Sequence, residues 1–209
     1  MNISFTKMAT FLLAFFCCAC ALFSINSAMA DNTVKPTTLA DKVSLSVEQV
    51  EKRLQINPGS DVSQHGDFIQ RKYFKVLKKP FLSSGSFEIS NNQFIWKTSK
   101  PVESAIIFKN GELYFKDNSG SKKAPAQAST IAKLLQHLIA GNFTALKSSF
   151  LFYDDNNTAD CVTLKPKTSA MTAFIEQIIL CGEKQVDEFV LFDKNMNRTE
   201  ISISYNKPS

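Results

Sequence analysis

The residues that could do chemistry in this chain are few, and their spacing matches no complete catalytic or metal-binding motif. Asp154 and Asp155 resemble the carboxylate pair of a hydrolase, but they begin an Asp-Asp-Asn-Asn run that is typical of a turn. The histidines, His65 and His137, have no second ligand at metal-binding spacing. Nothing near Cys161 marks it as an exposed, electropositive nucleophile. The sequence therefore predicts no enzymatic activity, no metal and no cofactor.

The first thirty residues have the layout of a secretory signal peptide. Lys7 supplies a positive start, residues 9–23 are uncharged and apolar, and Ala28-Met29-Ala30 offers small residues at the cleavage site. The apolar run is shorter than the ~20 residues that a spanning helix needs, which argues against a retained anchor. We therefore expect cleavage after Ala30 and a location in the periplasm. Lipoprotein-type processing at Cys17, Cys18 or Cys20 is the weaker alternative.

Export has consequences for charge and for the cysteines. Removing residues 1–30 removes Lys7 and no acid, so the formal net charge falls from +5 to +4. This mild excess suits an acidic membrane surface or partner and does not indicate nucleic acid. Cys161 and Cys181 are the cysteines left after Asp31, and an oxidising compartment favours a disulfide between them. Two buried thiols are the alternative.

The elements expected along the chain are many short strands and two helices. Asn110-Gly111 between alternating apolar runs predicts a tight hairpin, because both residues tolerate positive φ. Short strands spaced in this way indicate an antiparallel sandwich or barrel. The expected helices span residues 44–56 and 129–139, a polar loop spans 117–126, and the expected strands span 67–77, 84–90, 94–98, 104–109, 112–116, 148–153, 161–165, 173–181, 188–192 and 199–205.

A basic run follows the first expected strand. It contains Arg71, Lys72, Lys75, Lys78 and Lys79. Both faces of the strand mix apolar and charged residues, which fits an edge strand or one partly covered by a lid. We interpret the charge as protection of an exposed edge, with a docking patch for an acidic partner or lipid headgroup as the alternative.

Aromatic residues are the stronger indication of function. Five of the 18 phenylalanines precede Asp31, so thirteen remain in the exported chain together with Trp96. Most are expected in a core. A barrel of more than eight strands, however, cannot fill itself with side chains, and an apolar cavity suits acyl chains.

Several motifs in order make the chain resemble a known family. The resemblance is to the periplasmic outer-membrane lipoprotein carrier family, LolA, and it covers nearly the whole exported chain. The motifs that carry it are Phe68-x-Gln70, Phe94-x-Trp96 with Lys100-Pro101, Phe108-Lys-Asn-Gly-x-Leu-Tyr-Phe115, Val162-Thr-Leu-Lys-Pro-Lys167, Phe189-x-Leu-Phe-Asp193 and Thr199-Glu-Ile201.

One departure separates this chain from the family pattern. The family has an Arg-Pro before its F-x-W motif, and that arginine controls closing of a lid. Here Ser90-Asn91-Asn92-Gln93 stands in that place. The segment from Leu77 to Gly85 is similar to a divergent branch that can accompany lipid or polyene export systems.

The resemblance implies a fold and a function. The fold is mainly β with two or three helices, an unclosed antiparallel barrel capped by helices. Residues 1–30 would be the signal peptide, 31–42 a flexible lead-in and 43–209 the carrier domain.

The implied function is to shield lipoprotein or lipid acyl chains in transit. The chain would act as a monomer between an inner-membrane donor and an outer-membrane acceptor. The alternative is a periplasmic binding or scaffold module, without cargo, associated with an envelope lipid or polyene export system. An envelope hydrolase ranks last. The residues expected to line or cap the cavity are Phe94, Trp96, Phe108, Phe115, Leu134, Leu138 and Phe152.

Overall fold

The structure is a computed structural model, and it describes residues 43–56, 63–90, 93–124, 128–155 and 158–206. From Ser44 onward the chain forms one compact unit. The predicted signal peptide, its cleavage after Ala30 and the lead-in of residues 31–42 lie outside the described residues and stay predictions. None of the helices in the described ranges has the length and apolar character needed to cross a membrane.

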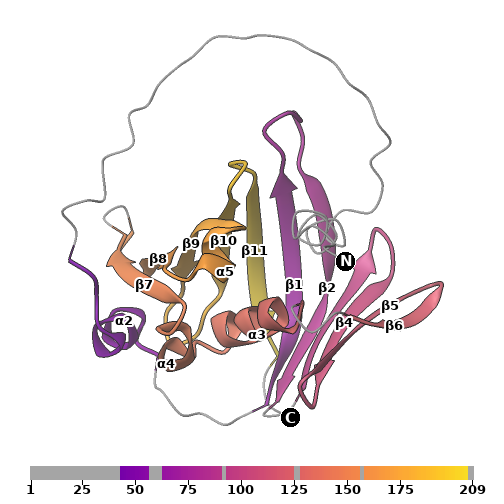
Figure 1. Ribbon diagram of the computed structural model, residues 1–209, viewed down its shortest axis with the longest axis horizontal. Helices are drawn as coiled ribbons and strands as arrows, with labels where there is room; N and C mark the ends of the chain where they lie inside the picture. The colour runs from indigo at the N-terminus through magenta and orange to yellow at the C-terminus, as the bar shows by residue number, and fades with distance from the viewer. Residues whose placement is uncertain (1–42, 57–62, 91–92, 125–127, 156–157, 207–209) are drawn as a thin grey trace. The chain divides into compact units, whose positions relative to one another are not determined.

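A single antiparallel sheet of eleven strands organises the described residues (Figure 1). Its order is β6-β5-β4-β3-β2-β1-β11-β10-β9-β8-β7, so β6 and β7 are the two edges and the sheet is not closed. The strands are β1 Gln64–Tyr73, β2 Phe81–Ser90, β3 Gln93–Lys100, β4 Ser104–Lys109, β5 Glu112–Asp117, β6 Gly120–Lys123, β7 Phe150–Asp154, β8 Cys161–Pro166, β9 Ile175–Cys181, β10 Glu188–Asp193 and β11 Arg198–Tyr205. The prediction of a mainly β, unclosed antiparallel architecture is confirmed.

Alternation along the strands gives the sheet one apolar face. In β1, Phe68, Gln70 and Lys72 are buried while the intervening residues are more exposed. The register carries this pattern across the sheet, since Phe68 pairs with Ile203 of β11 and with Gly85 of β2. We call the face that bears Phe68 the inner face and the opposite one the outer face.

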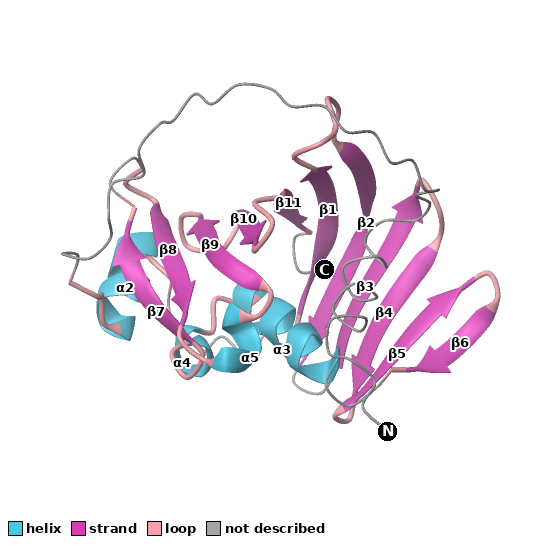
Figure 2. Cartoon of the chain, turned by 45° about the horizontal axis from the view of Figure 1, so that its top comes forward, coloured by secondary structure: helices cyan, strands magenta, loops and turns pink. Residues whose placement is uncertain are grey.

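Four helices complete the described unit, and two of them contact aromatic side chains of the inner face. They are α2 Val47–Leu54, α3 Ala128–Ile139, α4 Phe143–Leu146 and α5 Ser169–Thr172. Helix α3 packs against β4 and β5, and Figure 2 shows it crossing in front of the curved sheet. Its position is fixed in part by the Tyr205 hydroxyl, which donates to the Ile139 carbonyl at 3.1 Å. Helix α4 follows α3 directly and packs against α2.

Local sequence signals explain where the first helix begins and ends. Ser46 caps α2 through a capping box with Gln49, in which the Ser46 side chain accepts from the Gln49 N–H and the Gln49 side chain accepts from the Ser46 N–H. Gln55 then takes a left-handed conformation and ends the helix. Val50 and Leu54, one turn apart, are its buried residues.

Three expectations were wrong. The loop predicted at 117–126 contains β6, because Asp117 and Gly120 form a tight turn that returns the chain to β5. Helices α4 and α5 were missed, since four-residue helices leave no periodic pattern. The prediction that β1 is an edge fails because β1 pairs with both β2 and β11.

Candidate functional site

The densest aromatic packing lies on the inner face of β1, β2 and β3. The rings of Phe68 and Trp96 are stacked with centroids 3.7 Å apart. Phe87 and Phe94 lie 6.4 and 6.3 Å from the Trp96 ring. Trp96 is 1% exposed and Phe94 is fully buried. These four side chains form the aromatic cluster of the inner face.

Two glycines make room for the cluster. Gly66 pairs with Phe87 and Gly85 pairs with Phe68, so each of these aromatic residues faces a position without a side chain. A Cβ at Gly85 would lie 1.9 Å from the Lys97 carbonyl oxygen, and one at Gly66 would lie 2.1 Å from that of Ser204. Both contacts are far shorter than van der Waals distance, so only glycine permits the close approach of the neighbouring strands.

Most of the residues expected to line a cavity lie together. Phe94 pairs with Phe108 across β3 and β4, and Phe115 of β5 pairs with Ile106 on the same face. The Lys133 ammonium of α3 lies 5.7 Å from the centre of the Phe108 ring, which places α3 over this region. Leu134 and Leu138 are the predicted residues on α3, and both are buried.

Phe152 is separated from the others. It lies on β7 at one edge of the sheet, and six strands separate β7 from β3 in the sheet order. Its ring packs edge-on against Phe143 of α4 with centroids 6.0 Å apart. The backbone N–H of Leu45 also donates to the Phe152 carbonyl at 2.8 Å. Phe152 therefore belongs to the packing between α4 and β7.

The inner face also buries polar groups that the sequence reasoning did not select. Gln70 is 2% exposed and Lys72 is 3% exposed. In the described part of the chain, Gln64 Oε1, Gln70 Oε1 and Trp96 Nε1 are buried without a hydrogen-bond partner. Gln64 and Gln70 lie at even-numbered positions of β1, on the same face as Phe68, and this alternation could have identified them from the sequence. These atoms give an otherwise apolar face both acceptors and a donor.

The titratable groups near α3 are shifted by burial. Burial lowers the pKa of His137 below its usual value, and the neighbouring Lys133 charge acts in the same direction. Burial raises the pKa of Tyr205 above its usual range, with the Asp187 charge as a second cause. The Tyr205 hydroxyl donates to the Val186 carbonyl at 2.6 Å, which favours its neutral form. Near neutral pH, both side chains are therefore uncharged beside the inner face.

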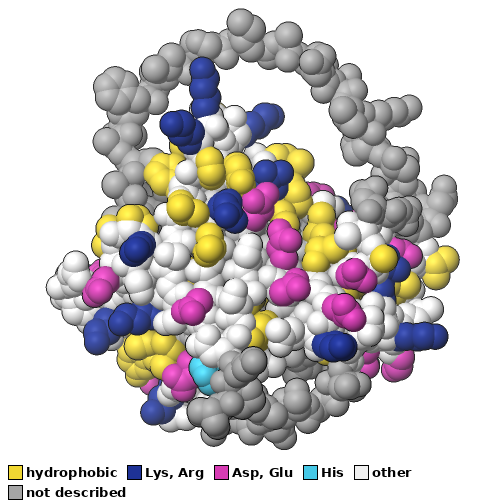
Figure 3. Space-filling model, turned by 180° about the vertical axis from the view of Figure 1, so that it is seen from behind, with side chains coloured by type: hydrophobic (Ala, Val, Ile, Leu, Met, Phe, Trp, Pro, Cys, Tyr) yellow, Lys and Arg dark blue, Asp and Glu magenta, His cyan; other side chains and the backbone are white. Residues whose placement is uncertain are grey.

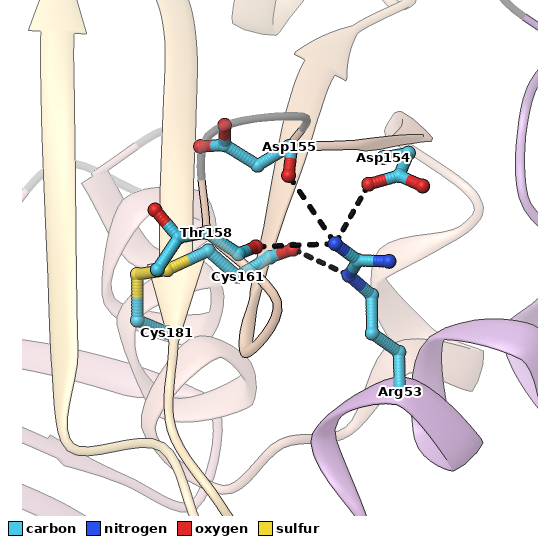
Figure 4. The surroundings of a disulfide bond; sticks show 6 residues. All are labelled: Arg53, Asp154, Asp155, Thr158, Cys161 and Cys181. Carbon is cyan, nitrogen blue, oxygen red and sulfur yellow. Dashed lines mark hydrogen bonds and ion pairs between the residues drawn. A yellow bond between two sulfur atoms is a disulfide. The ribbon is translucent and has the colours of Figure 1, made fainter.

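The residues first weighed as catalytic serve other contacts. Arg53 donates through Nε to the Cys161 carbonyl at 2.8 Å and through Nη2 to the carbonyls of Asp155 and Thr158 at 3.2 and 3.1 Å (Figure 4). The same Nη2 lies 2.7 Å from Asp154 Oδ1. The guanidinium thus joins α2 to the ends of β7 and β8. Asp154 has the partner expected of a structural carboxylate.

The predicted disulfide is present. Cys161 and Cys181 are directly paired residues of β8 and β9, and their sulfur atoms are bonded. The bond joins the neighbouring strands β8 and β9 (Figure 4). His65 is exposed on β1. Within the described ranges, no His, Cys, Asp and Glu residues gather in a way that could hold a metal ion.

An open antiparallel sheet with helices beside an aromatic inner face defines the class of protein. A family model described as outer membrane lipoprotein carrier protein LolA matches residues 62–208. The chain belongs to the LolA family, which confirms the resemblance found in its motifs. A search of curated proteins gives no match.

Three solved structures are among those to which this chain is similar. A LolA superfamily protein from Nitrosomonas europaea is 12% identical, with a TM-score of 0.46, 79% of this chain covered and 95% of that one. A putative outer membrane lipoprotein-sorting protein domain from Vibrio parahaemolyticus is 7% identical, with a TM-score of 0.40 and coverage of 76% and 89%. LprF from Mycobacterium bovis is 14% identical, with a TM-score of 0.39 and coverage of 80% and 97%.

Proposed function

We propose that this protein is a periplasmic carrier that holds the acyl chains of a lipoprotein or lipid against its inner face. The transfer would run from an inner-membrane donor to an outer-membrane acceptor and would involve no chemical step. Membership of a family described as lipoprotein carriers supports this proposal. The observation that carries it is the aromatic inner face, on which Phe94, Trp96 and Phe108 lie together on neighbouring strands.

The width of the sheet, compared with the length of helix α3, supports the proposal. Eleven strands at the usual spacing make a sheet about 48 Å wide along its curve. Helix α3, with 12 residues, is about 18 Å long. It packs against β4 and β5, while α2 and α4 pack toward β7 and β8. The strands between them carry Phe68, Phe87 and Trp96, which are buried in this structure, so an extended acyl chain would have to enter between these side chains and their present neighbours.

The energetics of burial are sufficient for such a role. Each methylene moved from water to an apolar face contributes about 0.8 kcal/mol, so burial of part of one chain gives useful affinity. The residues that would contact it are Phe94, Trp96, Phe108, Phe115, Leu134 and Leu138. Phe152, on the edge strand β7, lies apart from this group. The unpartnered Trp96 Nε1 and Gln70 Oε1 are suited to the ester or amide group at the head of the chain.

The test compares two half-buried apolar residues on opposite faces of the same strand pair. Phe115 points to the inner face and Ile107 to the outer face. Phe115→Glu places a charge where the acyl chain would lie, and Ile107→Glu is the matched control. Each variant would be exported in a bacterial host, purified from the periplasm and analysed by native mass spectrometry and lipid extraction.

We expect wild type and Ile107→Glu to carry co-purified lipid or acylated protein. Phe115→Glu should carry at least about tenfold less, with an unchanged circular dichroism spectrum, because a buried charge opposes acyl binding by more than 1.4 kcal/mol. An empty wild-type protein that also fails to bind an acylated fluorescent probe would contradict the carrier. That result would favour the periplasmic scaffold module instead.

A further inference from the structure

The connection between β1 and β2, together with the first two residues of β2, exposes apolar side chains in an unusual concentration. Four of these residues are exposed: Val76 is 89% exposed, Leu82 60%, Leu77 45% and Phe81 36%. Isolated exposed apolar residues are ordinary, but a group of them within seven consecutive positions marks an interaction surface. We call residues 75–82 the hairpin tip.

The hairpin tip is held in a defined conformation. The Leu77 N–H donates to the Phe74 carbonyl at 2.9 Å, and the rings of Phe74 and Phe81 pack edge-on with centroids 5.6 Å apart. The Lys75 N–H donates to Asn197 Oδ1 at 3.2 Å in the turn between β10 and β11. That turn adds another exposed apolar side chain, Met196, which is 59% exposed. The apolar groups are therefore presented outward by ordered backbone.

Positive charge accompanies these apolar groups. The tip contains Lys75, Lys78 and Lys79 and no acidic residue. None of the ion pairs found among the described residues involves these three lysines. The tip stands at the top of the described ribbon in Figure 1, and from behind, Figure 3 shows lysine or arginine and hydrophobic side chains side by side at that end.

The charge does not lie along a sheet edge. β1 and β2 are interior strands of the sheet, and Lys75, Lys78 and Lys79 lie beyond them, in the connection between the two strands. The lysines instead surround apolar groups at the end of a hairpin. Apolar side chains between lysines match an anionic bilayer, in which the former enter the acyl boundary and the latter bind phosphate.

We propose that the hairpin tip binds the surface of a membrane that contains anionic phospholipids. A protein partner would need a cavity shaped for four protruding side chains, whereas a bilayer accepts apolar side chains of any shape. The interaction would bring the molecule to a membrane whether or not its inner face holds a ligand. It therefore goes beyond the carrier function and can fail or hold independently of it.

Vesicle binding by the exported chain tests the proposal. Wild type would be mixed with vesicles of phosphatidylethanolamine and phosphatidylglycerol, and separately with vesicles of phosphatidylcholine alone. Binding should be at least tenfold tighter to the anionic vesicles and should weaken as salt is added, because salt screens the lysine charges. Equal binding to both kinds of vesicle, or no binding to either, would overturn the proposal.

Two pairs of variants separate the apolar and the charged contributions. Val76→Asp is matched by Val43→Asp, since Val43 is 88% exposed and lies outside the tip. Lys78→Glu with Lys79→Glu is matched by Lys109→Glu with Lys147→Glu, two exposed lysines elsewhere. Each tip variant should lower the affinity for anionic vesicles at least tenfold, while each control stays within about twofold of wild type. If a tip variant and its control lost the same affinity for anionic vesicles, the hairpin tip would not be the membrane-binding site.

A fluorescent reporter distinguishes insertion from adhesion by charge alone. Trp96 is buried and provides a constant background. Leu77→Trp places a second indole at the tip, and its emission should shift to shorter wavelength on anionic vesicles as the ring leaves water. An unshifted emission from vesicle-bound protein would overturn insertion, and so would undiminished binding by Val76→Asp. Binding to a soluble acidic protein but not to vesicles would likewise overturn it.

Discussion

Arg53 connects a helix to the sheet through one guanidinium group. It reaches the Cys161, Asp155 and Thr158 carbonyls as well as the Asp154 carboxylate. The planar fork of arginine can satisfy several acceptors at once, which the compact ammonium of lysine cannot do. Its side chain is 23% exposed, so these bonds are partly shielded from water.

We expect Arg53→Met to lower the free energy of unfolding by about 2 kcal/mol, because partly buried carbonyls lose a charged donor. Arg53→Lys should recover a minor part of this loss, since it keeps the charge without the fork. Urea unfolding followed by circular dichroism measures both. A variant Arg53→Met with wild-type stability would show that the guanidinium contacts contribute nothing to folding.

At the scale of single residues, sequence reasoning found the apolar positions and missed the polar ones. Phe94, Trp96 and Phe108 follow the period of two that a sheet imposes, so their shared face could be read directly. Gln70 and Lys72 obey the same period, but polar residues at buried positions contradict the usual rule that links polarity to exposure. The partners of Arg53 lie more than 100 positions away in the sequence, where no local pattern reports them.

At the scale of elements, the turn between β4 and β5 was predictable from two residues. Asn110 and Gly111 have φ values of 52° and 81°, as a tight hairpin requires. A Cβ at Gly111 would meet no atom within 4 Å, so the cost of replacing this glycine lies in the backbone alone. Helices of four residues and the short strand β6 offered no comparable signal.

The cost at Gly111 can be measured directly. Gly111→Ala should lower the free energy of unfolding by about 1 kcal/mol, because alanine disfavours positive φ. Gly111→Asn should lose less, since asparagine visits that region more readily. Thermal and urea unfolding of the two variants provide the comparison. If Gly111→Ala and Gly111→Asn lowered the free energy of unfolding equally, the preference of a residue for positive φ would not explain the loss.

At the scale of the whole molecule, the two open edges of the sheet are protected differently. At β7, Leu45 forms a bridge to Phe152 and covers part of the edge. At β6, all four residues are exposed and two are the lysines Lys122 and Lys123. An edge strand can pair with another copy of the chain, and lysines on it oppose that pairing.

Removing the charge on β6 should therefore promote self-association. We expect wild type to elute as a monomer and Lys122→Val with Lys123→Val to form dimers or larger species as concentration rises. Lys109→Val with Lys116→Val, at exposed positions on the paired strands β4 and β5, is the control. Size-exclusion chromatography with light scattering distinguishes them. A monomeric β6 variant would show that charge is not what keeps the edge free.

The order of strands also determines when the molecule can be completed. β1 to β6 and β7 to β11 are two runs in which each strand pairs with its neighbour in sequence, so each can form as soon as its residues emerge from a ribosome or a translocation pore. Within the sheet of the described residues, the two runs are joined by β1 against β11, whose pairing links Gly66 to Tyr205. Because β11 ends at Tyr205, a chain that emerges amino terminus first keeps its two halves apart until residue 205 is free. The continuous inner face therefore comes into existence only after β11 has emerged and paired with β1.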